Sequence, residues 1–169
     1  LEAEGYKQAS DTDTEVVAHL ITKYINDGLS PETATAAALK RLEGAFALGI
    51  IFAEEYDLLI AARQGSPLAI GYGDGEMFIG SDAIALAPLS RSITYLEEGD
   101  CAIISGSGAT IKDIKNPWKQ RLWKTAKFSY NLDEIEHDIL RKMNEPRIHF
   151  TIVCASISCP KLQNKAFKA

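Results

Sequence analysis

The sequence predicts an α+β fold in which helices come first and antiparallel strands follow. Residues 12–42 carry helix-start signals and apolar residues at helical spacing. Residues 44–105 change to short apolar runs separated by turns that contain glycine and aspartate, as strands do. Because helices and strands are segregated along the chain, a layered α+β domain is favoured over an alternating α/β one.

Two helices are expected near the start of the chain. Thr12 and Glu15 have the spacing of a capping box, so a helix should begin there, and Gly28 should end it. A second helix should begin at residues 30–32, where serine can cap and proline suits the first helical position. Its alanine-rich body extends to about Leu42. The first helix carries its large apolar residues on one face, so that face should be buried.

The short apolar segments that follow predict strands. Residues 44–53 form a nearly continuous apolar run, which is typical of a strand buried on both faces, and residues 58–62 form a shorter one. Asp74 and Gly75 suit a tight turn, so residues 68–72 and 77–80 should pair as a hairpin. The other elements expected here are a short helix at 82–87, a second hairpin made of 93–96 and 101–105, and a flexible break at 106–108.

The composition is that of an ordinary globular chain and argues against several classes of function. Apolar residues make up 46% and charged residues 24% of the 169. The net charge of -5 argues against nucleic-acid binding, which needs a basic face. No apolar run reaches the roughly 20 residues that span a membrane, no signal-peptide pattern is present, and three cysteines are too few for a disulfide framework. We therefore expect a cytoplasmic protein that binds no membrane.

Five ordered blocks in the first 110 residues resemble one enzyme family. Residues 10–20 read SDTDTEVVAHL, and the other blocks are LEGAFA at 42–47, AARQGSPL at 61–68, GSDA at 80–83 and LEEGD at 96–100. These blocks resemble the glutaminase domain of glucosamine-6-phosphate synthase, the isomerising glutamine–fructose-6-phosphate aminotransferase. The resemblance implies a class II amidotransferase of the N-terminal-nucleophile-hydrolase type, with an αββα sandwich of which this chain holds a part. In that family an N-terminal cysteine attacks the amide of L-glutamine, and ammonia passes to a sugar-isomerase domain that forms the hexosamine.

The resemblance carries over one binding residue and none of the catalytic ones. Asp13 falls on the family aspartate that binds the α-ammonium group of glutamine, although an acid at a helix start is favourable in any case. Residue 1 is leucine (Leu1) and not the family's cysteine, and neither the family's Arg-Trp-Ala-Thr-His-Gly stretch nor an Asn-Gly oxyanion pair occurs. Cys101 lies in a predicted strand and should be a small buried hydrophobe. Glutamine hydrolysis is therefore not expected of these residues alone, and no cofactor or metal is expected.

The last third of the chain resembles a different family. Residues 132–141 read LDEIEHDILR, residues 147–150 read RIHF and residues 154–160 read CASISCP. These blocks resemble a bacterial and plant domain of unknown function. The chain should then divide into residues 1–110, the C-terminal part of the amidotransferase domain, and residues 111–169, a small α/β fragment. A helix over 132–143 and a strand over 147–155 are expected in the fragment.

Two histidines and two cysteines in the second segment leave three interpretations open. Cys154 or Cys159 could be a thiol nucleophile with His137 or His149 as its base, which would make the segment a thiol-hydrolase-like or binding module. The same residues could bind a metal, although the two cysteines are spaced more widely than in most structural zinc sites. They could also be ordinary packing and capping residues, which is the interpretation that we favour.

Neither segment is a complete family domain, which has a physical consequence. Sheets that lack their outer strands expose unpaired edges, and such edges pair with other chains. We therefore also consider a non-enzymatic assembly or chimeric protein that associates with itself through open sheet edges.

Overall fold

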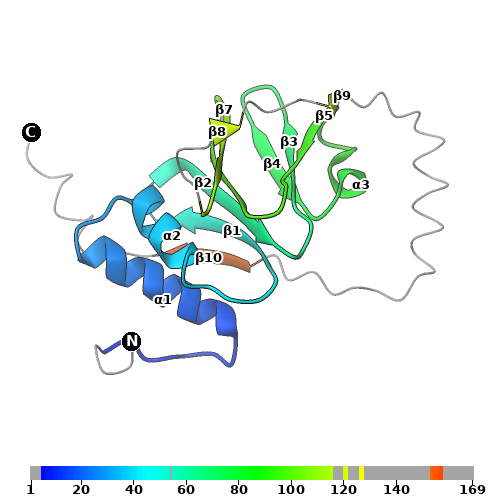
Figure 1. The fold of residues 1–169 in the computed structure, drawn as a ribbon. Helices are drawn as coiled ribbons and strands as arrows, with labels where there is room; N and C mark the ends of the chain where they lie inside the picture. Colours follow the sequence, from blue (N-terminus) through cyan, green and yellow to red (C-terminus); the bar gives the residue numbers. More distant parts are fainter. Residues whose placement is uncertain (1–4, 54, 116–119, 122–125, 128–152, 158–169) are drawn as a thin grey trace, which may run out of the picture.

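The computed structural model describes residues 5–53, 55–115, 120–121, 126–127 and 153–157. These residues form four layers (Figure 1). Helices α1 (Asp13–Asn26) and α2 (Pro31–Leu39) cover a six-stranded sheet, a four-stranded sheet stacks on its other face, and the short helix α3 (Ala83–Leu86) packs on the second sheet. The predicted α+β sandwich is therefore confirmed.

The chain passes between the two sheets more than once, so each sheet contains strands from separate parts of the sequence. The first sheet has the order β10-β1-β2-β6-β7-β8, and all of its pairs are antiparallel except the parallel pair β1 and β10. The second sheet has the order β4-β3-β5-β9 and is antiparallel. The strands of the first sheet are β1 (Phe46–Phe52), β2 (Glu55–Gln64), β6 (Asp100–Ser105), β7 (Gly108–Asp113), β8 (Gln120–Arg121) and β10 (Val153–Ile157). Those of the second are β3 (Ala69–Tyr72), β4 (Met77–Gly80), β5 (Ser92–Tyr95) and β9 (Ala126–Lys127).

Successive residues of strand β1 face opposite sides of its sheet, so the strand contacts both the helices and the second sheet. Leu48 and Ile50 lie on the helix side, in one buried cluster with Ile21 of α1 and Leu39 of α2. Gly49 lies on the other side, where a Cβ atom would come within 2.5 Å of Cδ1 of Ile79 in β4. The absence of a side chain at this position therefore lets the two sheets approach closely.

Three expectations about the strands were wrong in detail. Strand β2 begins at Glu55, earlier than predicted, because its exposed first residues still pair with β1 through a bulge. The segments expected to form a second hairpin, β5 and β6, lie in different sheets, since β5 pairs with β3 and β6 with β2. The expected flexible break at 106–108 is the turn of the β6–β7 hairpin, where the Gly106 N–H donates to Asp57 Oδ1 at 2.6 Å.

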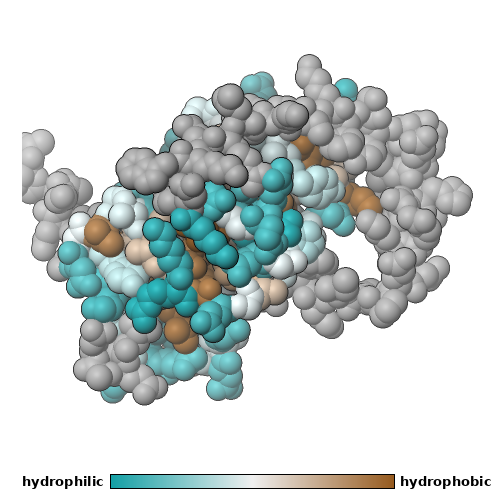
Figure 2. Space-filling view, viewed as in Figure 1, coloured by the Kyte–Doolittle hydropathy of each residue, from teal (hydrophilic) through white to brown (hydrophobic). Residues whose placement is uncertain are grey.

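Other expectations were confirmed. Both N-terminal helices and the β3–β4 hairpin occur where the sequence places them, although α2 ends at Leu39 and not near Leu42. Asp82 caps α3 by accepting a hydrogen bond from the Ala85 N–H at 3.0 Å. The helix expected over 132–143 lies outside the described residues. In the part of the chain described, no helix is long and apolar enough to cross a bilayer. Hydrophilic residues cover most of the coloured surface in Figure 2, and hydrophobic ones appear there singly or in small groups.

Candidate functional site

The start of α1 presents Asp13, the predicted glutamine ligand, to solvent. Thr12 precedes it in extended conformation, with φ -90° and ψ 131°, and Asp13 is the first helical residue. The carboxylate is exposed, and its Oδ1 accepts a hydrogen bond of 3.3 Å from the Thr14 hydroxyl. An acid at this position is stabilised by the helix dipole, and an exposed carboxylate can accept a bond from a cationic group. Asp13 therefore lies exposed at the first position of the helix, and its role as a glutamine ligand stays a prediction.

Glu15 holds the segment before the helix. Its carboxylate accepts hydrogen bonds of 2.7 Å from the backbone N–H groups of Ala9 and Ser10, and a third of 2.5 Å from the Ser10 hydroxyl. These bonds stabilise the charged form and lower the pKa of Glu15 to about 2, with the Ser10 hydroxyl as the largest cause. The predicted capping box is thus wrong. The Thr12 hydroxyl contacts the Ser10 hydroxyl at 2.8 Å and caps no helix N–H, so Glu15 reaches further back than residue 12.

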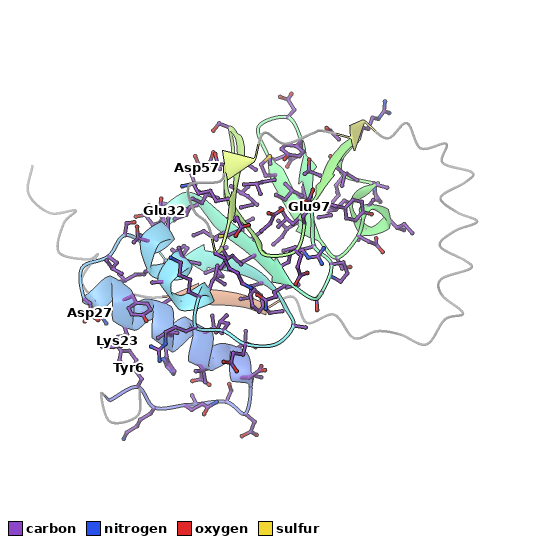
Figure 3. The ribbon with its side chains drawn as sticks, in the orientation of Figure 1. Tyr6, Lys23, Asp27, Glu32, Asp57 and Glu97 are labelled. Carbon is purple, nitrogen blue, oxygen red and sulfur yellow. The ribbon has the colours of Figure 1, made fainter. Side chains whose placement is uncertain are left out.

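His19 extends this contact along the helix. Its Nε2 lies 3.2 Å from Glu15 Oε1, and its ring lies 5.6 Å from the ring of Tyr6. The Tyr6 hydroxyl accepts a hydrogen bond of 3.2 Å from the amide of Asn26, near the other end of α1. Figure 3 shows Tyr6 below the helix, on the extended segment that runs along it. Residues 6–10 are therefore held against α1 at both ends. Glu15, which was expected to form a capping box with Thr12, and His19, for which the sequence predicted no chemical role, support the helix start instead.

A second cluster joins two matched motifs, residues 61–68 and 96–100. Arg63 in β2 donates to the Leu96 carbonyl at 2.9 Å and to the carboxylate of Glu98 at 3.1 Å. The same carboxylate accepts from the Gly65 N–H at 2.9 and 3.0 Å. Gly65 has φ +73°, and a Cβ there would lie 2.6 Å from that of Ala45. This arrangement shows that the arginine and glycine of these motifs shape a loop.

Two groups in β6, the buried Asp100 and the partly buried Cys101, have shifted pKa values. Burial raises the pKa of Asp100 from its ordinary 3.8 to about 6, and the nearby Asp113 carboxylate adds to the increase while Arg63 opposes it. Burial likewise raises the pKa of the Cys101 thiol to about 12. A thiol of that pKa has almost no thiolate at neutral pH, so Cys101 is not suited to nucleophilic attack. Its expected role as a small packing residue agrees with its contact to the core beneath α1 and α2.

Two cavities lie away from the helix start. One of about 480 Å³ lies between the start of α2 and the β6–β7 hairpin, and its acidic residues are Glu32, Glu55 and Asp57. Figure 3 labels the first and the last of these. Another of about 350 Å³ is lined in part by apolar residues that include Ile51 and Met77. Asp13 lines neither cavity, and no cluster of His, Cys, Asp or Glu suited to a metal ion occurs among the described residues.

Of the four residues predicted as a possible thiol site in the last third of the chain, the structure describes only one. His137, His149 and Cys159 lie outside the described residues. Cys154 is described by its backbone in β10, where it stands in register with Gly49. The described strand is Val153–Ile157, which overlaps the predicted strand over 147–155 at residues 153–155. Residues 147–152 of that prediction lie outside the described part. The thiol and metal interpretations of this segment stay predictions.

Comparison with known proteins bears on the helix-start motif. The profile of a family described as "Glutamine amidotransferase domain" matches residues 1–88, slightly more than half of the chain. The chain belongs to this glutamine amidotransferase family. A second profile, "Protein of unknown function, DUF547", matches residues 101–169, which confirms the second resemblance.

Two bacterial proteins illustrate the relatives of the amidotransferase part. The chain is 59% identical over 111 residues to a glutamine–fructose-6-phosphate aminotransferase (isomerizing) of Mesorhizobium japonicum, which covers 66% of this chain and 18% of that protein. A protein of the same name from Brucella abortus is 55% identical over 116 residues, covering 69% and 19%. The chain thus spans about a fifth of the length of these relatives. Among solved structures, a glutamine phosphoribosylpyrophosphate amidotransferase from B. subtilis matches with a TM-score of 0.54 and 25% identity, over 67% of this chain and 25% of the other.

Proposed function

We propose that this chain carries the glutamine-recognising part of a glutamine-hydrolysing domain of the kind that serves hexosamine-forming aminotransferases. The proposal is carried by the arrangement of the SDTDTE segment. In it, the Glu15 carboxylate accepts hydrogen bonds from the backbone N–H groups of Ala9 and Ser10, while Asp13 is exposed to solvent. The names of the relatives support L-glutamine as the ligand. The division into residues 1–110 and 111–169, and a cytoplasmic location, are parts of the same proposal.

Asp13 would select an amino acid over a simple amide. A carboxylate that accepts a charge-assisted hydrogen bond from an ammonium group contributes about 1.5–3 kcal/mol. Glutamine has such a group next to its carboxylate, whereas an amide that lacks the α-amino group has none. The negative charge of Asp13 would therefore make the site prefer an amino acid over a simple amide, which packing alone would not do.

Hydrolysis by these residues alone is not part of the proposal. Cys101 is the one cysteine whose side chain the structure describes, and its thiol is held protonated by burial. The reaction scheme of the family needs a thiol that a nearby amine can deprotonate. We therefore propose that the described part binds glutamine and that a nucleophile would have to come from outside the described residues.

Glutamine titration followed by amide NMR tests the binding role. Asp13→Asn should weaken glutamine binding about 10- to 100-fold, which is the loss of one charge-assisted contact. Asp11→Asn is the matched control, because Asp11 is an exposed carboxylate two residues away in the same segment. Glutaric acid monoamide, which lacks the α-amino group, should bind wild type as weakly as glutamine binds the Asp13→Asn variant. Equal glutamine affinity of the two aspartate variants would overturn the assignment.

A coupled assay for glutamate release tests the second half of the proposal. The purified chain and its Cys101→Ala variant should both stay at the background rate. Release above background that disappears in Cys101→Ala would show that the buried thiol is a nucleophile after all.

A further inference from the structure

Strand β10 joins the two family segments in one sheet. It lies at the edge of the first sheet beside β1, in parallel orientation, with five residue pairs from Leu48–Val153 to Phe52–Ile157. Strand β1 belongs to the amidotransferase match, and β10 to the match of unknown function. In Figure 1, β10 (orange) runs beside β1 and next to α1, with which it also makes contact. The second segment therefore contributes structure to the first.

The edge that β10 covers differs from the other sheet edges. Strand β1 has seven residues, FALGIIF, without a charge or a proline. The other described edge strands are shorter, since β8 and β9 have two residues each and β4 has four. A long, apolar and uncharged edge presents a row of unpaired N–H and C=O groups that another strand can pair with, whereas short edges offer little. Ile51 of β1, still 41% exposed, adds apolar surface at this place.

We propose that the edge of β1 is a strand-acceptor surface, and that residues 153–157 of the same chain are its occupant and keep it from pairing with a second copy. The inference does not depend on glutamine binding. It follows from the parallel register, from the apolar character of β1 and from the origin of β10 in a segment that resembles another family. A strand that is tethered to the acceptor meets it at a higher effective concentration than a free copy does, which favours pairing within the chain.

Two truncated chains test this inference. The chain that ends at residue 152 lacks β10, and the chain that ends at residue 157 keeps it and is the matched control. By light scattering across a micromolar dilution series, the control should have the mass of one chain and the shorter chain should form dimers or larger species. The backbone amides of β1 should also exchange with deuterium faster in the shorter chain when it is diluted. An unchanged mass together with unchanged amide exchange in β1 would overturn the proposal.

A second pair of variants decides the question if the shorter chain does not fold. Alternate N–H groups of an edge strand point toward the partner, so at least one of Ala155→Pro and Ser156→Pro removes a ladder hydrogen bond in the full-length chain. At least one of the two should speed amide exchange in β1, while Ala166→Pro, outside the strand, should not. If neither strand variant changes exchange in β1, residues 153–157 do not cover this edge.

Discussion

Substitution of Gly49 measures how closely the two sheets approach. A Cβ atom at this position would lie 2.5 Å from Cδ1 and 3.9 Å from Cγ1 of Ile79. Real Cβ contacts are not as short as the first of these, so the isoleucine must change rotamer or the sheets must move apart. Overpacking of this kind costs about 1–3 kcal/mol, and the lower end of that range applies here because Cδ1 is the free end of a flexible side chain. We therefore expect Gly49→Ala to lower the free energy of unfolding by about 1 kcal/mol, measured by urea denaturation followed by circular dichroism.

The partner residue supplies the control for this prediction. Ile79→Val removes the Cδ1 atom that the new methyl group would meet, and it costs about 0.5–1.5 kcal/mol by itself. In that background Gly49→Ala should be neutral or should stabilise by up to about 1 kcal/mol, because alanine restricts the unfolded chain more than glycine does. The double-mutant cycle should then give a coupling of about 1–2 kcal/mol. Additive effects, within about 0.5 kcal/mol, would refute the close contact between β1 and β4.

Three further predictions concern pH and reactivity. The pKa of Asp100 is about 6 in the folded chain and has an ordinary value of 3.8. The free energy of unfolding should therefore fall as the pH rises from about 4 to 6. Asp100→Asn should flatten this pH dependence in urea denaturation. A free energy of unfolding that rises between about pH 4 and 6 would contradict the raised pKa of Asp100. The lowered pKa of Glu15 has the opposite sign, so its stabilisation should be present above about pH 4.5 and lost toward pH 2, and Glu15→Gln should speed amide exchange at Ala9 and Ser10. Unchanged exchange there would show that Glu15 does not hold this segment. Cys101 should resist alkylation by iodoacetamide at about pH 8 until urea unfolds the chain. Mass spectrometry of the peptide that contains Cys101 measures the labelling. Labelling in the folded protein would disprove the burial of this thiol.

Local sequence signals predicted the elements well where the signal was strong. The apolar run at 44–53 became β1, the Asp74-Gly75 turn joined β3 to β4, and Ser30 caps α2 through the Thr33 N–H at 3.3 Å. In each case the determinant is a property of neighbouring residues. Helix caps and tight turns are of this kind, so a single sequence is enough to place them.

Pairing between strands was predicted less well, for a physical reason. Strands β5 and β6 are both short, apolar and separated by a glycine-containing turn, which is also the pattern of a hairpin. Their separation into two sheets depends on β3 and β2, which lie earlier in the chain. The pairing of β1 with β10 is still less local, and neither segment carries a mark of it.

The sequence predicted the position of the candidate site but not the hydrogen bonds that hold the segment around it. The sequence placed Asp13 at a helix start, and the structure confirms that position, while its binding role stays a prediction. Glu15 was expected to bond close to Thr12 and instead bonds Ala9 and Ser10. The Ser10 hydroxyl competes for the same carboxylate, and a pattern of residue types does not show which donor is nearer.

The parallel pairing of β1 with β10 also sets an order of events during synthesis. Val153 follows its partner Leu48 by about 105 residues, so a ribosome that adds about 5–20 residues per second completes β10 roughly 5–20 s after β1. During that interval β1 can pair with β2, but its other edge, which β10 later covers, has no partner. Neighbouring ribosomes on one messenger hold other copies in the same condition. The yield of correctly folded chains should therefore depend on the speed of translation through the last third, and on holdase chaperones that bind apolar segments until it is complete.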